Sequence, residues 1–312
     1  MKAAVLRDYS LPPAFGDFPE PEPADGGVVV DVAAAGVNHV DLMKATGTFY
    51  TGAPPLPSVV GSDGVGRLPD GRRVYFDAAI APFGSMAQRA LVPEHAVIDV
   101  ADGIDDAVAA AMGNTGLAAW LALTRRAELA AGETVLVLGA TGAVGQIAVQ
   151  AANVLGAGRV VAAAVEPERL GPLRHRGADA VVDLGAESDL AAAFEEAAGG
   201  TIDVTIDLVW GPAAVAAIQA ASRSARHVQI GHMSGLAATL PAPAIRSAEL
   251  DLLGFAIFHY PIEVRGEAFR ELGERVAAGE IAFDVERVPL EDVDGAWERQ
   301  ARGAGVKLVI TP

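Results

Sequence analysis

The sequence predicts an α/β protein with two domains, one β-rich and one built on a doubly wound parallel sheet that binds a nucleotide. Three observations lead to this prediction. The first hundred or so residues are short apolar runs separated by Gly and Pro, a pattern typical of strands and turns. From residue 134 onward, apolar runs alternate with helical patterns, which predicts parallel strands joined by right-handed crossovers. A glycine-rich turn follows the first of those runs.

Composition narrows the class of protein. The 312 residues are 51% hydrophobic and 20% charged, which is typical of a folded chain long enough for two domains. The net charge of −17 argues against a nucleic-acid or anionic membrane surface. The absence of cysteine excludes disulfides, thiolate nucleophiles and cysteine-ligated zinc. The first ten residues become polar too soon for a signal peptide, and no long uninterrupted apolar window occurs, so we expect a cytoplasmic protein without a membrane span.

The elements follow from the pattern of apolar residues. In the β-rich part we expect strands at 28–33 and Arg73–Phe76, then helical segments at 104–112 and 116–126. In the second part we expect strands at Thr134–Leu138, 159–165, Ala180–Asp183, 204–209 and 227–230, and helices at 144–155, 168–176, 189–198 and 212–221. A helix at 263–278 and a strand at 306–310 should pack back onto the β-rich domain. The expected domains are therefore 1–107, 108–251 and the returning segment 252–312.

The glycine turn is the clearest functional signal. The run Thr134–Leu138 stops on Gly139, Gly142 and Gly145 follow at three-residue spacing, and a helical pattern begins at Gln146. Glycine allows a tight turn and a close approach of backbone N–H groups to phosphates at a helix N-terminus. This order of strand, turn and helix predicts a site for the pyrophosphate of a nucleotide.

Two more residues are placed by the sheet itself. Gly231 and His232 follow the expected strand 227–230, so they should lie at the carboxyl edge where such sheets bind ligands. His232 is equally well explained as an exposed loop residue.

Four segments together resemble a known family. They are G-V-N-H-V-D at 36–41, P-L-P-S-V-V-G-S-D-G-V-G at 55–66, G-L-A-A-W-L-A-L at 116–123 and G-A-T-G-A-V-G at 139–145. In this order they resemble the zinc-free quinone oxidoreductase (zeta-crystallin-like) branch of the medium-chain dehydrogenase/reductase superfamily. The resemblance implies a GroES-like β-rich catalytic domain, a Rossmann nucleotide-binding domain and an NAD(P)H-dependent oxidoreductase.

The resemblance also implies a set of cofactor contacts. The residues matching the family's cofactor segments are Asn38, Asp41, Asn114, Thr115, Gly139, Thr141, Gly142, Ala143, Val144 and Gly145. Asn38 and Asp41 have an alternative role in the turn and cap of a helix.

Zinc is not expected. Asn38 stands where zinc-containing relatives have their first cysteine ligand, and Ser62 and Asp63 replace their histidine and glutamate. His39 with Asp41 or Asp63 is the remaining metal candidate, but zinc sites without cysteine usually need more histidines than this.

The second strand of a dinucleotide fold selects the cofactor. An acid at its end accepts the ribose hydroxyls of NAD, and a cation there suits the 2′-phosphate of NADP. By resemblance, Ala164 occupies the acid position and Arg169 matches a lysine that contacts the 2′-phosphate, so NADP(H) is expected over NAD(H). Glu166 opposes this choice unless it only opens the next helix.

The resemblance implies an apolar, electrophilic small-molecule substrate, either a quinone or an α,β-unsaturated carbonyl. Its oxygen needs a hydrogen-bond or proton donor, for which Tyr50, His39 and His232 are candidates beside solvent. Phe49 rather than Tyr50 aligns with the branch's tyrosine. Aromatic walls could come from Phe83, Trp210, Phe258 and Tyr260, although core or subunit packing explains each of them equally well.

Two other functions stay open. An enoyl-thioester reductase would need a positive entrance, and only Arg67, Arg72 and Arg73 cluster in the β-rich domain. A non-catalytic NADPH-binding protein, crystallin-like or regulatory, would use the same fold.

The segment 251–259 resembles the strand that joins two sheets across the family's dimer, so a homodimer is expected.

Overall fold

The computed structural model describes residues 1–23, 26–50 and 52–312. It forms two compact units. Unit 1 comprises Met1–Gly116, Pro261–Gly279 and Phe283–Pro312, and unit 2 comprises Leu117–Tyr260 and Glu280–Ala282. The changes from one unit to the other at Gly116 and Tyr260 lie later in the chain than the boundaries expected after residues 107 and 251.

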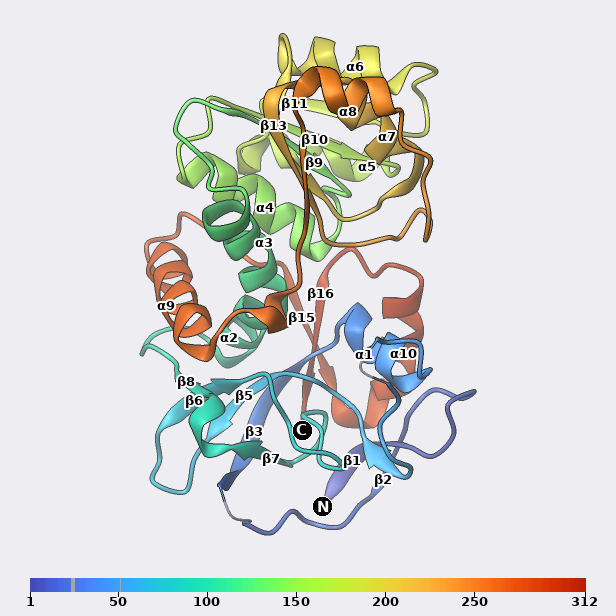
Figure 1. Ribbon diagram of the computed structural model, residues 1–312. Coiled ribbons are helices and arrows are strands. Elements are labelled where there is room, and N and C mark those ends of the chain that lie inside the picture. Colours follow the sequence, from blue (N-terminus) through green and yellow to red (C-terminus); the bar gives the residue numbers. More distant parts are fainter. Residues whose placement is uncertain (24–25, 51) are drawn as a thin grey trace. The chain divides into compact units, whose positions relative to one another are not determined.

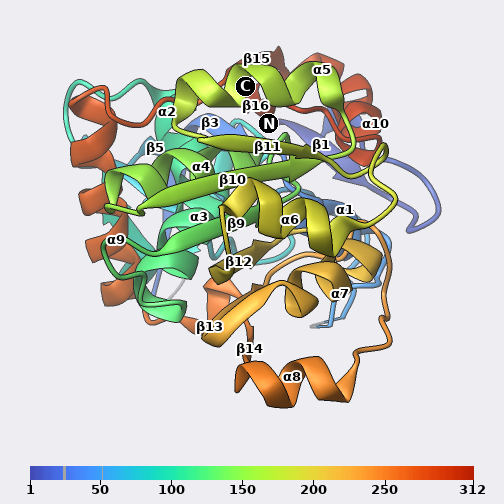
Figure 2. The same ribbon diagram turned by 90° about the horizontal axis from the view of Figure 1, so that it is seen from above.

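Unit 2 is a doubly wound parallel sheet. Figure 2 shows its strands in the order β11-β10-β9-β12-β13-β14. Chain order runs outward from β9 to β11 on one side and from β12 to β14 on the other, so the order reverses between β9 and β12. The elements are α3 (Leu117–Leu121), β9 (Thr134–Leu138), α4 (Ala143–Val154), β10 (Arg159–Ala164), α5 (Pro167–Leu170), β11 (Ala180–Asp183), α6 (Leu190–Ala198), β12 (Ile202–Asp207), α7 (Gly211–Gln219), β13 (Ala221–Gln229), α8 (Ala242–Ala248) and β14 (Asp251–Gly254).

Alternation along the strands fills the core of unit 2. Leu136 and Leu138 of β9 pack with Val161 of β10 against Phe194 of α6 and Ala214 of α7. Side chains in a strand alternate between the two faces of the sheet. The apolar residues on one face therefore pack against α6 and α7, while those on the other face are available for α4. This two-sided burial is why these strands are nearly continuous apolar runs.

Two segments of unit 2 differ from the sequence-based prediction. The strand expected at 227–230 is β13, which begins at Ala221, where it pairs with Ile202 of β12 before a register shift leads to the pair of Val204 with Arg226. The strand expected over 251–259 is shorter. It ends at Gly254 and is followed by a turn of 3-10 helix, Ile257–His259.

Unit 1 is the β-rich unit. Its larger sheet has the order β15-β16-β3-β5-β6-β8, with β7 also paired to β3, and its smaller sheet has the order β2-β1-β4. The elements are β1 (Lys2–Leu6), β2 (Ala14–Asp17), β3 (Gly27–Gly36), α1 (His39–Ala45), β4 (Ser58–Val59), β5 (Gly64–Arg67), β6 (Arg73–Phe76), β7 (Arg89–Pro93), β8 (Val97–Asp99), α2 (Asp106–Ala111), α9 (Ile262–Ala277), β15 (Val285–Pro289), α10 (Val293–Ala301) and β16 (Lys307–Thr311).

The two ends of the chain meet in unit 1. In Figure 1 the red strand β16 lies beside the blue strand β3, and the two are antiparallel. Leu308 and Ile310 of β16 join Leu6, Val37 and Trp297 in one buried cluster. The returning C-terminal segment is therefore part of the core of unit 1, as the sequence predicts.

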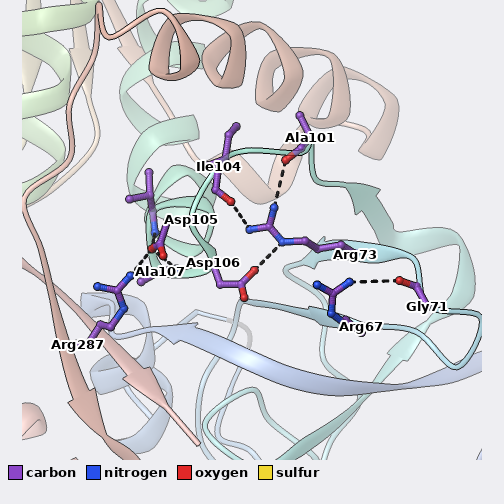
Figure 3. A network of polar contacts seen from close by, with 10 residues as sticks. Arg67, Gly71, Arg73, Ala101, Ile104, Asp105, Asp106, Ala107 and Arg287 are labelled. Atoms are coloured by element: carbon purple, nitrogen blue, oxygen red, sulfur yellow. Dashed lines mark hydrogen bonds and ion pairs between the residues drawn. The ribbon is translucent and has the colours of Figure 1, made fainter.

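An ion-pair network holds the start of α2 in unit 1 (Figure 3). Asp105 caps the helix by accepting from the backbone N–H groups of Ala107 and Val108, and Arg287 of β15 pairs with the same carboxylate. Arg73 donates to Asp106 at 2.6 Å. A capping acid at this position typically adds about 1 kcal/mol to stability. The network thereby fixes the direction in which the helix leaves the sheet.

One helical stretch, Asp106–Arg126, which is kinked at Gly113, bears on the expectation of no membrane-spanning segment. It is long and apolar enough to cross a membrane, with a mean hydropathy of 1.3. However, 83% of that window is buried inside the protein. Buried core helices pass the same test of length and composition, so this stretch is weak evidence for a span.

Candidate cofactor and substrate sites

The glycine turn of unit 2 is shaped by close backbone contacts. Gly139 has φ +81°, which favours glycine, and Gly142 N–H donates to the Gly139 carbonyl at 3.1 Å. A Cβ on Gly145 would lie 2.3 Å from the Gly139 oxygen, so only glycine lets α4 start this close to the turn. Gly139 and Gly145 therefore each have a geometric reason to be glycine.

The N-terminus of α4 fits a pyrophosphate. Gly142 is the N-cap, no side chain caps the helix, and its first turn, which begins with Ala143 and Val144, carries no acidic residue. The unsatisfied N–H groups and the positive end of the dipole of this 12-residue helix favour a bound anion. The residues present thus fit the phosphates of a dinucleotide.

Glu166 and Arg169 are both tied to the turn. Thr141 donates its hydroxyl to Glu166 Oε2 at 2.6 Å, and Arg169 donates to the Thr141 carbonyl at 2.9 Å. Both side chains are half-buried, and Ala164 is the last residue of β10. Glu166 is therefore more than a solvated residue opening a helix, because it fixes the Thr141 side chain beside the phosphate-binding turn.

A second backbone support lies at the end of β12, where the strand order reverses. Buried Asp207 accepts from the N–H groups of Val209 and Trp210 at 2.9 and 2.8 Å and contacts His227 Nε2 at 2.9 Å. Trp210 has φ +60° and ψ −160°, a region that is strained for any residue except glycine. The sequence analysis missed Asp207, whose signal is a charged residue closing an apolar run.

This segment lies directly against the glycine turn. A Cβ on Gly139 would be 2.9 Å from Val209 Cγ1, and one on Gly231 would be 2.4 Å from the Leu208 carbonyl. Gly231 thus belongs to the carboxyl edge as predicted. His232 beside it is exposed in a loop, which agrees with its alternative role as a loop residue.

Unit 1 buries a polar cluster around Asp63, which is completely inaccessible. Asn38 Nδ2 donates to Asp63 Oδ1 at 2.7 Å, and Lys307 Nζ donates to Asn38 Oδ1 and, at 2.9 Å, to the Val37 carbonyl. On the other side of Asp63, Asn114 N–H and the Tyr75 hydroxyl donate to Oδ2 at 2.9 and 3.3 Å. Residues from distant parts of the unit, β6 and β16 among them, therefore meet at one carboxylate.

A kink delivers the Asn114 N–H. Gly113 has ψ −113°, outside the helical range, and a Cβ there would lie 2.1 Å from the Tyr75 ring. The missing side chain lets the helix pack on Tyr75 and turns the Asn114 N–H toward Asp63. Thr115, the next predicted contact, is buried.

Burial sets the electrostatics of this cluster. It raises the pKa of the Asp63 carboxyl, opposed by the Lys307 charge, and it lowers the pKa of the Lys307 ammonium, opposed by Asp63 and Asp41. It also raises the pKa of the Tyr75 phenol, with a further contribution from the Asp63 charge. Tyr75 is therefore held as a neutral donor.

Asp41 has two different oxygens. Its Oδ2 accepts from the Asn38 N–H at 2.9 Å, which caps α1, while Oδ1 is buried and has no hydrogen-bond partner among the described residues. Asp41 also lines a pocket of about 340 Å³ within unit 1. The capping role weighed for this residue is therefore present.

The other predicted donors lie on the surface. His39 is the exposed first residue of α1, and Tyr50 is 65% exposed with its ring 4.1 Å from that of Phe49. Phe83 packs edge-on against Phe18, with 6.0 Å between the ring centroids, and is not among the described residues lining the pocket. The cations of the pocket and cluster, Lys44 and Lys307, were both missed by the sequence analysis, although Lys307 is the one charged residue in β16.

The residues at the zinc positions do not form a zinc ligand set. The Asn38 oxygen accepts from the Lys307 ammonium, and Asp63 is occupied by three donors. A metal cation at Asn38 would have to displace another cation. Among residues 1–23, 26–50 and 52–312, no group of three or more His, Asp or Glu side chains is arranged to hold a metal.

Comparison with known proteins shows the family to which the chain belongs. A family model described as zinc-binding dehydrogenase matches residues 143–276. The quinone oxidoreductase of Thermus thermophilus, solved alone and in complex with NADPH, is 30% identical, with a TM-score of 0.84 and all of both chains covered. The chain belongs to the quinone oxidoreductase-like family of medium-chain dehydrogenases/reductases. This membership confirms the resemblance and the predicted GroES-like and Rossmann fold class.

Two curated relatives of this family member differ in kind. A quinone oxidoreductase of Pseudomonas aeruginosa is 31% identical over 205 residues, which are 62% of each protein. A mycocerosic acid synthase-like polyketide synthase of Mycobacterium tuberculosis is 30% identical over 227 residues, which are 70% of this chain and 10% of that protein. The chain thus spans less than two thirds of the length of both.

The Asp63 cluster leads to a prediction about pH. Folding raises the pKa of the Asp63 carboxyl, so its contribution to the free energy of unfolding is fully present below the ordinary pKa of 3.8. That contribution is lost as pH rises through the raised pKa, and the charge of Lys307 limits the loss. We expect Lys307→Met to lower the free energy of unfolding by about 3 kcal/mol or more at neutral pH. The deficit should shrink as pH falls toward 3.8, where a protonated Asp63 needs no counter-charge.

Denaturant titrations across pH measure this effect. Lys2→Met serves as the control, because Lys2 pairs with Asp17 at the surface, where such pairs contribute little. A Lys307→Met deficit that is absent, or the same at every pH, would contradict the role given to the ammonium.

Proposed function

We propose that the protein is an NADPH-dependent, zinc-independent reductase that transfers hydride to a quinone or an α,β-unsaturated carbonyl. The observation that carries this proposal is the α4 N-terminus, which Gly145 brings against the turn and which has neither a capping side chain nor an acid in its first turn. Family membership and the NADPH complex of the Thermus relative support it.

Residues of the two units have separate roles in this proposal. The turn Gly139–Gly145, with Thr141, Gly142, Ala143 and Val144, would hold the pyrophosphate, and NADPH when bound supplies the hydride. In the pocket of unit 1, Lys44 donates to Ser62 Oγ at 2.9 Å. These two donors would stabilise the negative charge that develops on the substrate oxygen. Tyr50, His39 and His232 stay further candidates for proton transfer.

Zinc independence rests on the Asn38 position, where an ammonium occupies the amide oxygen. The absence of zinc in the mechanism leaves charge stabilisation to hydrogen-bond donors. No step is assigned to a metal.

A second function is favoured by one observation. The similarity to a segment of a mycobacterial polyketide synthase supports an enoyl-thioester reductase. A thioester substrate on a long acyl carrier arm needs more room and a cationic entrance. Lys44 is the sole Lys or Arg among the described residues lining the pocket. A small acceptor is therefore the preferred substrate.

We expect saturable NADPH oxidation with at least one acceptor from a panel of 1,4-benzoquinone, phenanthrenequinone, simple enones and a crotonyl thioester. Hydride delivery to an aligned acceptor is the chemistry that a bound nicotinamide cofactor supplies. The measurement is loss of NADPH absorbance, with product analysis by mass spectrometry.

Two outcomes would contradict the proposal. NADPH binding without oxidation of any acceptor would favour the non-catalytic, crystallin-like or regulatory use of the fold. Stoichiometric zinc in the purified protein, with rates abolished by a chelator, would overturn zinc independence.

We propose NADP(H) over NAD(H) because Arg169, which follows the second strand β10, donates to the Thr141 carbonyl in the glycine turn. We expect Arg169→Ala to raise the Kd for NADPH by about 10- to 100-fold, since a charge-assisted hydrogen bond to phosphate contributes about 1.5–3 kcal/mol. The Kd for NADH should change little. Isothermal titration with both cofactors measures the ratio.

Arg174→Ala is the matched control, because Arg174 lies nearby but donates to the Asp179 carbonyl. Equal weakening of both cofactors by Arg169→Ala would indicate only a structural role through Thr141. Such a result would leave the cofactor preference without support.

We also propose a cytoplasmic homodimer that binds neither nucleic acid nor membrane. The strand β14 ends the sheet of unit 2, and Leu252 on it is 43% exposed, so an unpaired strand edge carries an apolar side chain. We expect Leu252→Lys to convert the dimer to a monomer in sedimentation velocity. Leu11→Lys, at an exposed residue of unit 1, should leave the dimer intact. A monomeric parent protein would refute the proposal.

A further inference from the structure

A buried acid–histidine pair joins the neighbouring strands β12 and β13 in unit 2 (Figure 2). Asp207 is the last residue of β12 and His227 lies on β13, with 0% and 1% of their side chains exposed. His227 Nε2 lies 2.9 Å from Asp207 Oδ2, and it is the donor because a carboxylate only accepts. Nδ1 has no hydrogen-bond partner among the described residues, so the contact with Asp207 is the only hydrogen bond of this ring there.

The pair fixes the start of the segment Leu208–Gly211, which follows β12. Asp207 Oδ1 accepts from the backbone N–H groups of Val209 and Trp210 at 2.9 and 2.8 Å. His227 holds the other oxygen, which keeps the carboxylate turned toward these two donors. Hydrogen bonds to a charged group are the stronger kind, and burial removes the water that would compete for them. The conformation of the segment therefore depends on one carboxylate and on the histidine that orients it.

The segment is held in a strained conformation. Trp210 has φ +60° and ψ −160°, and Gly211 follows with φ +69°. Only glycine adopts the first of these regions without strain, so Trp210 persists there because its surroundings fix it. Those surroundings include the bond to Asp207 and an edge-on contact with the His227 ring, whose centroid is 6.2 Å from that of Trp210. Backbone strain of this kind concentrates at ligand-binding segments, which indicates a role beyond stability.

The segment lies between the glycine turn and the loop that follows β13. A Cβ on Gly139 would be 2.9 Å from Val209 Cγ1, and the Ser234 N–H donates to the Val209 carbonyl at 2.7 Å. Leu208, Val209 and Trp210 are only half-buried, unlike the pair that supports them. A ligand at this edge of the sheet can therefore touch the segment without reaching the buried side chains.

The position of the segment in the sheet indicates which part of the cofactor it serves. A doubly wound sheet binds a dinucleotide across the point where the strand order reverses, with one mononucleotide on each half. The glycine turn and Arg169 follow β9 and β10 of the first half, whereas Leu208–Gly211 follows β12, the first strand of the second half.

We propose that Asp207 and His227 are positioning residues for the nicotinamide half of the dinucleotide. They hold Leu208–Gly211 in the conformation that receives this half, and they do not touch it. This inference rests on the proposed function and deepens it, because it separates the residues that serve the nicotinamide half from the glycine turn and Arg169, which serve the phosphates.

Binding of a whole and a half cofactor separates this role from a general structural one. NADPH spans both halves of the site, whereas adenosine 2′,5′-bisphosphate carries only groups of the adenosine half. In isothermal titration, His227→Phe should raise the Kd for NADPH at least about tenfold, because Asp207 loses the donor that orients it. The Kd for the bisphosphate should change by less than about twofold, because its site is independent of the pair. An equal rise in both Kd values, or no rise in either, would overturn the proposal.

Two conservative variants carry the same test, even if His227→Phe folds poorly. His227→Gln keeps an N–H donor for the carboxylate, so the Kd for NADPH should stay within about threefold of the wild-type value. Asp207→Asn keeps an oxygen for the two backbone donors but removes the charge that strengthens their hydrogen bonds, so this Kd should rise at least about threefold. A larger rise in His227→Gln than in Asp207→Asn would contradict the role of the hydrogen bond.

Ser222→Ala is the matched control. Ser222 Oγ donates to Asp203 Oδ1 at 2.7 Å, so this bond joins the same two strands near their amino ends, away from the edge that binds ligands. Its removal should leave the Kd values of both ligands unchanged. A rise in the Kd for NADPH alone would show that any loosening of β12 and β13 has this effect, and would refute the specific role of the pair.

Turnover separates this inference from the proposed function. If the Kd values follow the expected pattern but no acceptor is reduced, the reductase function fails and the positioning pair stands. If acceptors are reduced and every variant keeps the wild-type Kd for NADPH, the reductase stands and the positioning role falls. If NADPH does not bind at all, both fall.

Discussion

The burial of the Asp63 carboxylate is the constraint on which unit 1 depends. A charge removed from water must be met by donors, and here they come from Asn38, Tyr75 and the Asn114 backbone, with Lys307 behind Asn38. Each donor belongs to a different element. The carboxylate therefore orders the start of α1, the kink at Gly113 and the register of the last strand at the same time. It also keeps Asn38 and Asp41 in place beside the pocket.

The candidate sites of the two units are built differently. In unit 2 the site is backbone: Gly145 allows the approach of α4, and buried Asp207 holds the strained Trp210 segment beside the turn. In unit 1 the site is side chains, with charges and hydroxyls placed around a small pocket. A backbone site suits a phosphate group that is the same in every turnover. A side-chain site can be altered by single substitutions.

The described lining of the pocket in unit 1 contains no aromatic residue. The resemblance to the family implied an apolar electrophile, and the sequence offered aromatic residues as walls for it, yet Phe83 packs against Phe18 instead. Lys44 lines that pocket, whereas Tyr50 and His39 are exposed and are not among its described lining residues.

The sequence alone determined the parts that rest on local physics. The strands Arg73–Phe76, Thr134–Leu138 and Ala180–Asp183 lie at their predicted residues because apolar pattern and turn residues agree there. The glycine turn was equally predictable, because its requirement for space and positive φ acts within a few residues. Tertiary structure alone decided the rest. Lys307 and Asn38 are separated by 269 residues, and no local pattern states that a charge in the last strand will meet an amide near the first helix. The pairing of β13 from Ala221 and the unpartnered oxygen of Asp41 likewise arise only when distant elements pack, because burial and partners are properties of the folded whole.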